Sequence, residues 1–304
     1  MEKVAFLFAG QGSQYVGMGK DFFDSFPESK IIFNQACDVL GFNISQICFN
    51  GPPEQLKPTN ISQPAIVTMA IAALEAFRRR HGVTPEYCAG LSLGEYSALI
   101  AAGAIKFRDG LVLIKKRGEI MEQEAQRLPG RMAAILELDL AKVSEICSQT
   151  GAEIANLNCP GQVVVTGKAL AVNDAANLCT RAGAKRVVHL EVSGGFHSSL
   201  MLHASERLKK VLDETPIRDP GIPVIGNFTA RPQQTADEIR ANLVKQIHSP
   251  VRWEESMRYM LAQGVTAFFE FGPGKVLKGL MRKIDPNAKV ITVDKAEDLN
   301  SLRA

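Results

Sequence analysis

The sequence predicts an α/β fold in which a mainly parallel sheet carries a smaller domain as an insertion. Strand-like and helix-like segments alternate from the first residues onward, and this order favours parallel strands joined by helices. Further along, a serine between two glycines separates a short apolar segment from a helix-like pattern. In the middle of the chain the order of elements changes, and segments rich in breaker residues enclose the changed part.

The first part of the chain contains one expected strand and a long expected helix. The apolar run Lys3–Phe8 is typical of a buried strand. Within Ser62–Arg80, apolar residues recur every three or four positions, which predicts a helix. The remaining expected elements of this part are a turn at residues 10–14, a strand at 87–89, and helices over Gly94–Ala102 and Arg108–Gln126.

Residues 129–194 are expected to form the inserted domain. Strand, helix, strand, strand, helix and strand follow one another there, which is the ferredoxin-like pattern. These elements are Arg131–Leu138, Leu140–Thr150, Glu153–Leu157, Gln162–Thr166, Ala169–Ala182 and Lys185–Val192. Leu128-Pro129-Gly130 and Ser193-Gly194-Gly195 mark the two boundaries. Residues 1–128 and 195–304 would then form a discontinuous larger domain.

The C-terminal part returns to alternating helices and strands. Its expected helices are Ser199–Leu212, Ala236–Ile247 and Gly274–Ile284, and its expected strands are Pro223–Asn227, Thr266–Phe271 and Lys289–Val293. The sequence contains no internal repeat and no low-complexity segment.

Composition limits the class of protein. The chain has 304 residues, of which 46% are hydrophobic, and a net charge of +3. This near-neutral charge does not indicate a nucleic-acid partner. The six cysteines show no CxxC or Cys/His ligand spacing, so we expect reduced thiols and no metal site. We see no secretory signal pattern and no apolar run of ~20 residues, so we expect a cytoplasmic protein without a membrane span.

Ser92 is the first candidate for chemistry. It lies in Gly90-Leu91-Ser92-Leu93-Gly94, after an apolar strand and before a helix, as a nucleophile on a tight turn requires. Such a turn exposes the hydroxyl and points the N–H of Leu93 at a developing oxyanion. The alternative interpretation is a helix N-cap serine, with Glu95 three residues later completing a capping box.

A serine nucleophile needs a base, and the chain has five histidines. His81 follows an arginine run at an expected helix end, His189 lies in a strand of the inserted domain, and His203 and His248 lie on or after helices. His197 differs, because it lies in a glycine-rich loop where the chain rejoins the larger domain. Such a loop can bring a side chain to the top of a sheet, although a loop histidine is more often only exposed.

Arg117 is a candidate for substrate binding. Within Arg108–Glu124 it falls on the apolar side of the helix, together with Ile114 and Met121. A buried arginine needs a partner, because an unpaired buried charge is costly. The partner could be an acidic side chain of the protein or the carboxylate of a substrate, to which a guanidinium can donate two parallel hydrogen bonds.

Seven segments together resemble one family. They are FLFAGQGSQ, GLSLGEYSAL, KKRGEIM, NCPGQVVVTG, GGFHSSLM, QIHSPVRW and FGPGKVL, and they follow the order of that family over nearly the whole chain. The family is that of the malonyl-coenzyme A:acyl carrier protein transacylases of fatty-acid synthesis, with the related acyltransferase domains of polyketide synthases. The resemblance implies an α/β-hydrolase-like larger domain.

The resemblance also implies roles for individual residues. Ser92 would be the nucleophile, His197 its general base, and Gln246 would orient His197 through its backbone carbonyl. The backbone N–H groups of Gln11 and Leu93 would form the oxyanion hole. The substrate-binding residues would be Arg117, which holds the malonyl carboxylate, together with Gln63, Phe196 and Met121. Phe196 resembles the malonyl-selecting form of this loop.

The implied reaction is a ping-pong transfer. Malonyl-coenzyme A would acylate Ser92, coenzyme A would leave, and the phosphopantetheine thiol of holo acyl carrier protein would take the malonyl group. The resemblance implies no permanently bound cofactor or metal, and we expect a monomer.

Three alternatives remain open from the sequence. The first is a free-standing acyltransferase that serves a polyketide synthase. The second is a serine hydrolase or thioesterase, which would need a triad acid, and Asp109, Asp139 and Asp174 are the aspartates between Ser92 and His197. The third is an inactive docking partner of a synthase assembly.

Overall fold

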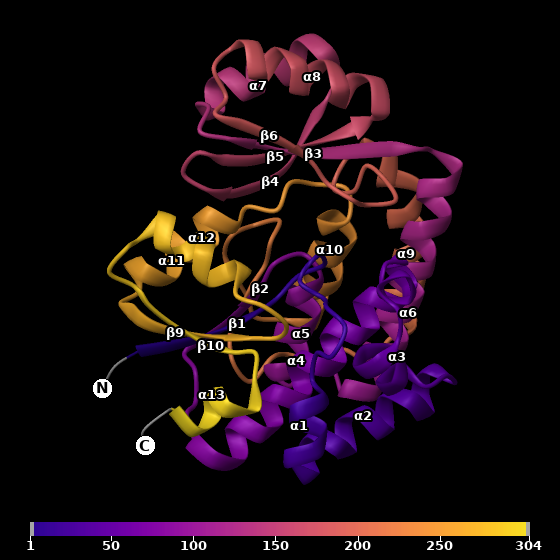
Figure 1. Ribbon diagram of the computed structural model, residues 1–304, viewed down its shortest axis with the longest axis vertical. Helices are drawn as coiled ribbons and strands as arrows, with labels where there is room; N and C mark the ends of the chain where they lie inside the picture. The colour runs from indigo at the N-terminus through magenta and orange to yellow at the C-terminus, as the bar shows by residue number, and fades with distance from the viewer. Residues whose placement is uncertain (1–2, 302–304) are drawn as a thin grey trace.

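The computed structural model describes residues 3–301 and contains two separate sheets (Figure 1). The larger sheet has the strand order β10-β9-β1-β2-β7-β8, in which all pairs are parallel except β7 with β8. Its strands are β1 (Lys3–Phe8), β2 (Tyr87–Gly90), β7 (Val224–Ile225), β8 (Pro232–Gln233), β9 (Val265–Phe271) and β10 (Lys289–Val293). The prediction of an α/β protein with a mainly parallel sheet is therefore confirmed.

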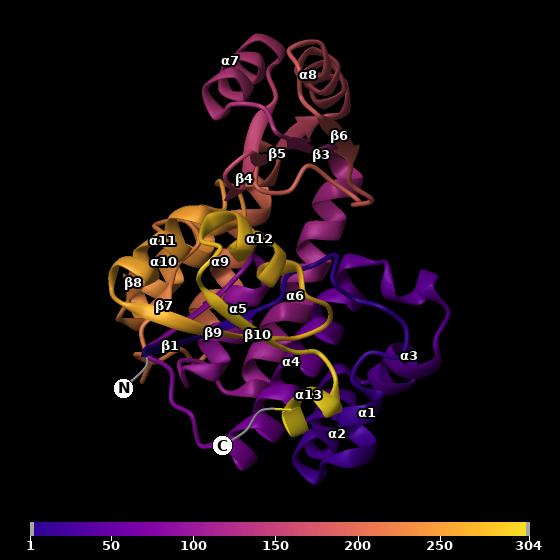
Figure 2. The same cartoon turned by 60° about the vertical axis from the view of Figure 1, so that its left-hand side comes forward.

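The smaller sheet is antiparallel throughout, with the strand order β4-β5-β3-β6. Its six elements occur in the expected chain order: β3 (Gly130–Leu136), α7 (Leu140–Thr150), β4 (Glu153–Cys159), β5 (Gln162–Lys168), α8 (Ala169–Arg181) and β6 (Arg186–His189). Figure 2 shows α7 and α8 on the side of this sheet that faces away from the larger one.

A long buried helix fills the core beside the larger sheet. Helix α4 (Thr59–His81) packs Phe77 against Phe6 of β1 and Phe271 of β9, with ring centroids 5.6 and 5.2 Å apart. By length and composition alone, α4 is long and apolar enough to cross a bilayer. From the sequence, no apolar segment of that length was expected. Most of its residues are buried inside the protein, as in a core helix.

The remaining helices surround the larger sheet. Four helical elements between residues 20 and 56 were absent from the prediction: α1 (Lys20–Ser25), α2 (Pro27–Leu40), α3 (Ile44–Asn50) and the 3-10 helix η1 (Pro53–Leu56). Helix α2 carried recognisable signals, because Pro27 opens it and Gly41, at φ 75°, ends it. The other helical elements are α5 (Leu93–Ala101), α6 (Phe107–Arg127), η2 (Ser199–Met201), α9 (Leu202–Glu214), α10 (Ala236–Gln246), α11 (Trp253–Ala262), α12 (Val276–Ile284) and α13 (Ala296–Ser301). Of these, α11 and α13 were also absent from the prediction.

The smaller sheet is joined to segments outside both sheets by hydrogen bonds as well as by the covalent chain. Val251 extends the edge of β4: its N–H donates to Ala155 O at 2.8 Å, and its carbonyl accepts from Leu157 N at 2.9 Å. The hydroxyl of Thr166 on β5 donates to Phe196 O at 2.8 Å. The smaller sheet thus holds the loop that carries His197 against the larger sheet.

Candidate active site

Ser92 lies on a tight turn between β2 and α5. Its backbone has φ 51° and ψ −100°, a conformation that L-residues rarely adopt and that costs of order 1–3 kcal/mol. The flanking glycines make the turn possible. A Cβ on Gly90 would lie 2.0 Å from the Gly94 carbonyl carbon, and one on Gly94 would lie 2.1 Å from Phe8 O. The structure therefore explains both glycines of the motif by close backbone packing.

The hydroxyl oxygen of Ser92 lies 2.8 Å from His197 Nε2. On the other side of the ring, His197 Nδ1 lies 2.8 Å from the backbone carbonyl of Gln246. A carbonyl can only accept, so Nδ1 carries the proton and Nε2 is free to accept from Ser92. Burial and the nearby Arg117 lower the pKa of His197 to about 4. His197 is therefore a neutral imidazole at neutral pH, as a general base must be.

The third partner of this pair is a backbone carbonyl and not a carboxylate. Among residues 3–301, the aspartates considered for a triad have other places: Asp139, for example, caps α7 by accepting from Ala141 N at 2.9 Å. The geometry thus gives a serine–histidine pair oriented by Gln246, without the acid that the hydrolase alternative requires.

Arg117 lies beside the nucleophile and is fully buried. Its Nη1 donates to Gln63 Oε1 at 2.8 Å, and its Nη2 lies 3.2 Å from Gln246 Oε1 and 3.3 Å from Ser92 Oγ. Its guanidinium carbon lies 5.1 Å from the centroid of the Tyr96 ring. Within the described chain, the partners of Arg117 are neutral groups and its Nε has no hydrogen-bond partner, so the internal salt bridge considered from the sequence does not form.

Two further predicted residues complete the surroundings of Arg117. The side-chain nitrogen of Gln63 donates to Gln11 Oε1 at 3.2 Å and lies 3.5 Å from Met121 Sδ. Gln63 thereby links the turn after β1 to helix α6. Its amide oxygen is left to face Arg117, which fixes the position of the guanidinium group.

The predicted oxyanion donors lie where two parallel strands end. Gln11 follows β1, and Leu93 is the first residue of α5, after β2. Strands β1 and β2 are parallel, so both backbone N–H groups lie at the same edge of the sheet. The N–H of Leu93 is also one of the free donors at a helix N-terminus, where negative charge is stabilised.

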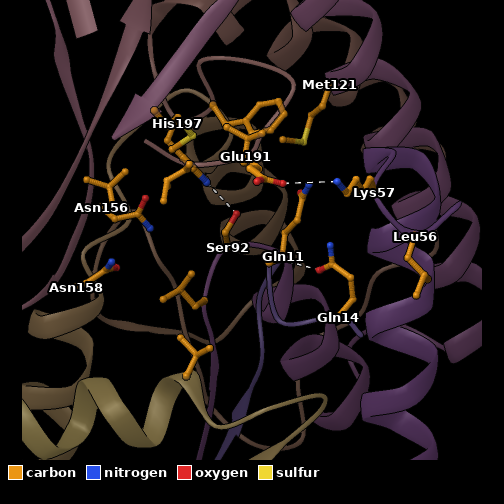
Figure 3. Close-up of a pocket in the computed structure, with 18 of the residues that line it drawn as sticks. Gln11, Gln14, Leu56, Lys57, Ser92, Met121, Asn156, Asn158, Glu191 and His197 are labelled. Atoms are coloured by element: carbon orange, nitrogen blue, oxygen red, sulfur yellow. Dashed lines mark hydrogen bonds and ion pairs between the residues drawn. The ribbon is translucent and has the colours of Figure 1, made fainter. Parts of the chain in front are cut away.

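A cavity of about 530 Å³ opens above Ser92. It is lined by five of the predicted residues: Gln11, Ser92, Met121, Phe196 and His197. Leu93, Gln63, Arg117 and Gln246 are at most 1% exposed, and support the site from beneath. Figure 3 shows Ser92 and His197 pointing toward each other at the base of the cavity.

Sequence reasoning missed polar residues on the walls of this cavity. Asn156 and Asn158 of β4 face it from the smaller sheet, opposite Gln11 (Figure 3). Lys57 and Glu191 form an ion pair of 3.6 Å at its mouth. The sequence predicted a strand at Glu153–Leu157, but it held no signal for which side chains of that strand would meet the serine.

Sequence reasoning also missed a buried polar cluster beneath the serine. Glu95 does not complete a capping box, because the Ser92 side chain caps no helix N–H. Instead its carboxylate accepts hydrogen bonds from Asn227 N, Gln233 Nε2 and Gln246 Nε2, at 2.9, 2.7 and 2.9 Å. Asn227 in turn accepts from the backbone N–H of Ser92 at 2.6 Å.

The fold and site together define a class: an α/β protein with a serine–histidine pair on a strand-to-helix turn and a buried arginine beside the serine. Comparisons with known proteins give the family. Residues 5–293 match the model of the acyl transferase domain.

Named relatives match over nearly the whole chain. The chain is 46% identical to the malonyl CoA-acyl carrier protein transacylase of Bacillus subtilis, covering 98% of this chain and 96% of the relative. It is 39% identical to that of Staphylococcus aureus, covering 98% of both.

Solved structures agree with these relatives. An acyl-carrier-protein S-malonyltransferase from Bartonella henselae superposes with a TM-score of 0.94 at 38% identity, covering 98% of both chains. A malonyl-transacylase solved in complex with its type II PKS acyl-carrier protein superposes with a TM-score of 0.96 at 36% identity, also covering 98% of both. The chain belongs to the acyl transferase domain family and, within it, to the malonyl CoA-acyl carrier protein transacylases.

Proposed function

We propose that this protein transfers the malonyl group from malonyl-coenzyme A to the phosphopantetheine thiol of holo acyl carrier protein. The observation that carries the proposal is the position of Arg117, whose Nη2 lies 3.3 Å from the Ser92 hydroxyl without an acidic partner. An acyl group on Ser92 that ends in a carboxylate would give the guanidinium a direct anionic partner. The names of the relatives support the same activity.

In the first half-reaction, Ser92 Oγ attacks the thioester carbonyl of malonyl-coenzyme A while His197 Nε2 takes the hydroxyl proton. The N–H groups of Gln11 and Leu93 stabilise the oxyanion of the tetrahedral intermediate. The carbon–sulfur bond then breaks, His197 returns its proton to the coenzyme A sulfur, and the malonyl group remains as an ester on Ser92.

In the second half-reaction, the carrier thiol attacks the ester and His197 accepts its proton. Collapse of the second tetrahedral intermediate breaks the bond to Ser92 Oγ, which recovers a proton from His197. In both steps the backbone carbonyl of Gln246 accepts a hydrogen bond from Nδ1 of His197. This contact orients the imidazole and stabilises its protonated form, and the carbonyl cannot take the proton. Coenzyme A is thus a product, and the reaction needs no permanently bound cofactor.

Selectivity for malonyl over acetyl follows from Arg117 and the packing around it. An acetyl group would leave the buried guanidinium without a direct anionic partner, which is a cost that a malonyl carboxylate removes. Phe196, which is 4% exposed, fills the cavity wall next to His197 and limits the space for a branched acyl group. Met121 and Gln63 hold the opposite wall and the guanidinium.

The carrier protein would approach along α12. Val276 and Leu280 of this helix line the cavity, so α12 borders its mouth. Helix α12, which has no acidic residue, and its N-cap residue carry four exposed basic side chains: Lys275 at the N-cap, and Lys278, Arg282 and Lys283 in the helix. Such a basic surface favours an acidic partner. The neighbour solved with its acyl-carrier protein supports the class of partner.

We place the protein in the supply of extender units for fatty-acid synthesis in the cytoplasm, acting as a monomer. The PKS origin of the carrier in one structural neighbour makes polyketide synthesis the second candidate pathway.

For the architecture, we propose an α/β-hydrolase-like domain of residues 1–128 and 195–304 and a ferredoxin-like domain of residues 129–194. The strand–helix–strand–strand–helix–strand order of the antiparallel sheet supports the latter.

Intact-mass analysis tests the activity. The protein incubated with malonyl-coenzyme A should gain one malonyl group, and the group should move to holo acyl carrier protein when that is added. Ser92→Ala should gain none. Release of free malonate as the main product would favour a hydrolase, and no adduct at all would favour an inactive docking partner. A panel of fatty-acid and polyketide carrier proteins separates the two pathways.

A further inference from the structure

Glu95 is a fully buried carboxylate for which the reaction described above has no use. All three of its hydrogen-bond partners are N–H donors: the backbone of Asn227 and the side-chain amides of Gln233 and Gln246. A protonated carboxyl group would need an acceptor for its own hydrogen, and these three contacts offer none. Burial is the largest influence on Glu95 and raises its pKa above the ordinary value, although the N–H donors and Arg117 partly oppose this. The contacts fit the ionised form.

Gln246 connects Glu95 to Arg117. Its amide nitrogen donates to Glu95 Oε2 at 2.9 Å, and its amide oxygen accepts from Arg117 Nη2 at 3.2 Å. The amide therefore has its positive end toward the anion and its negative end toward the cation. The same nitrogen also donates to the backbone carbonyl of Ser92 at 2.9 Å.

This relay resolves the electrostatic problem that Arg117 creates. Arg117 is buried with neutral partners, and such a cation requires a compensating charge. Glu95 supplies that charge from a position one side chain away. Because it does not touch the guanidinium, Arg117 remains free to bind a carboxylate on Ser92.

We propose that Glu95 is a positioning residue that acts through Gln246: it holds the amide oxygen toward Arg117 and balances the positive charge of Arg117 and of His197 when protonated. The inference rests on the proposed function, since it concerns how the same site handles a malonyl group. The sequence motif GLSLGE would then carry the nucleophile and the counter-charge of the site within four residues.

The proposal predicts two effects of opposite sign when the charge is removed. Without Glu95, the field of Arg117 is uncompensated and the site should bind a carboxylate more tightly. The imidazolium that forms during acylation should at the same time be less stable, because it arises next to an unbalanced cation. A merely structural loss would weaken both binding and acylation.

Glu95→Gln removes the charge with little change of shape. The double variant Glu95→Gln, Gln233→Glu is a second test in case Glu95→Gln does not fold. It exchanges the amide and the carboxylate of one hydrogen-bonded pair, so that the pair can still form. The new amide at position 95 can donate to the new carboxylate at position 233, which can still accept from Asn242. The double variant therefore moves the charge away from Gln246 by one side chain. Glu124→Gln is the matched control, since Glu124 is a buried carboxylate of α6 that bonds to Arg127 and His203.

Two measurements are needed. Calorimetry in a Ser92→Ala background gives the Kd of malonyl-coenzyme A relative to that of acetyl-coenzyme A, which isolates the carboxylate contact without turnover. Single-turnover acylation, followed by intact mass in proteins that retain Ser92, gives the rate of ester formation. For Glu95→Gln we expect the preference for malonyl-coenzyme A to rise about tenfold and acylation to slow about tenfold. The double variant should lie between it and the parent, and the control should stay within about twofold of the parent.

The outcomes separate the inference from the proposed function. If the parent neither prefers malonyl-coenzyme A nor acylates Ser92, the proposed function fails and the inference fails with it. If the parent does both, an unchanged or reduced malonyl preference in Glu95→Gln overturns the inference alone. If Glu95→Gln does not fold, the double variant takes its place in the test. A double variant with the malonyl preference and the acylation rate of the parent would overturn the role of the charge.

Discussion

The guanidinium group of Arg117 donates a hydrogen bond to the hydroxyl oxygen of Ser92 across 3.3 Å. A tight turn and a helix residue 25 positions further along the chain thus bring a cation to the atom that would carry the acyl group. The selecting group and the reacting group share one contact, so changes to Arg117 should alter which acyl group is transferred and not only how fast.

Arg117→Ala should exchange the acyl preference. Malonyl transfer should fall by at least about 30-fold in kcat/KM, because the loss of a buried charge partner costs roughly 2–5 kcal/mol. Acetyl transfer should rise, because no unpaired cation then faces the methyl group. Steady-state transfer to holo carrier protein with the two thioesters measures both effects. Arg117→Lys keeps the charge but loses the planar fork, and should give an intermediate preference. An unchanged ratio would disprove the role of Arg117.

The pH dependence of acylation should report the depressed pKa of His197. The base must be neutral to accept the Ser92 proton, and its pKa is lowered to about 4. The rate constant for malonyl-enzyme formation should therefore be flat from about pH 8 to about pH 5, and fall as protons bind near pH 4. Rapid-quench single-turnover measurements with brief exposure to acid would show this. A midpoint near the ordinary histidine value of ~6.5 would mean that burial and Arg117 do not govern the base.

Gly94→Ala tests the packing of the turn. The new Cβ would lie 2.1 Å from Phe8 O, so β1 and α5 would have to separate. We expect a loss of more than about 3 kcal/mol in the free energy of unfolding, together with loss of acylation. Gly279→Ala is the matched control, because a Cβ there meets nothing within 4 Å in a helix interior. It should stabilise by about 0.5–1 kcal/mol in denaturant titrations. Equal stability of the two variants would contradict the close-packing account.

Local patterns marked Ser92, Arg117 and His197 as candidates, and the family resemblance supplied their roles. The turn at Ser92 follows from the spacing of two glycines, and the buried position of Arg117 follows from helix periodicity. His197 stood out because two glycines shortly precede it in a loop. Each of these signals lies within a few neighbouring residues, which is the range over which the period of an element can be read.

The cluster around Glu95 could not be predicted in this way. Its partners Asn227 and Gln233 lie 132 and 138 positions away, and chain spacing says nothing about such contacts. The local pattern was also misleading, because a serine followed three residues later by glutamate is a capping box in other helices. The elements between residues 20 and 56 were missed for another reason: most of them are short, and short amphipathic segments give weak periodicity.

Charge reversal on α12 should affect only the second half-reaction. Arg282→Glu with Lys283→Glu should raise the KM for holo carrier protein about tenfold or more, because like charges would then face an acidic partner. Acylation by malonyl-coenzyme A should change little, since Ser92 and Arg117 are untouched. Reversal of Lys142 and Arg181 is the control, as α7 and α8 lie on the far side of the smaller sheet (Figure 1). Equal effects of the two pairs would exclude α12 as the docking face.

Glu270 should make folding stability depend on pH. This fully buried side chain of β9 accepts from Leu277 N and Lys278 N at the start of α12, at 2.8 and 2.9 Å, and burial raises its pKa to about 7. Glu95 has three N–H donors and Arg117 nearby. Glu270 has only two donors and has Asp294 nearby, so burial outweighs the donors there. The folded state therefore holds a proton between pH 4.5 and 7 that the unfolded state has lost. The stabilisation is present below pH 4.5 and disappears as pH rises through 7, a change of about 3 kcal/mol.

Glu270→Gln cannot titrate and should lack this dependence. Its amide oxygen can accept from only one of the two α12 N–H groups well, so at about pH 5 it should be clearly less stable than the parent protein. At about pH 8 the parent has lost its advantage, and the two free energies of unfolding should approach each other. Denaturant titrations of both proteins at steps of about one pH unit over this range give the difference directly, and titration of His197 cancels because both proteins contain it. A difference that stays constant over this range would show that Glu270 remains ionised in the folded protein, in which case the cap on α12 outweighs the cost of burial.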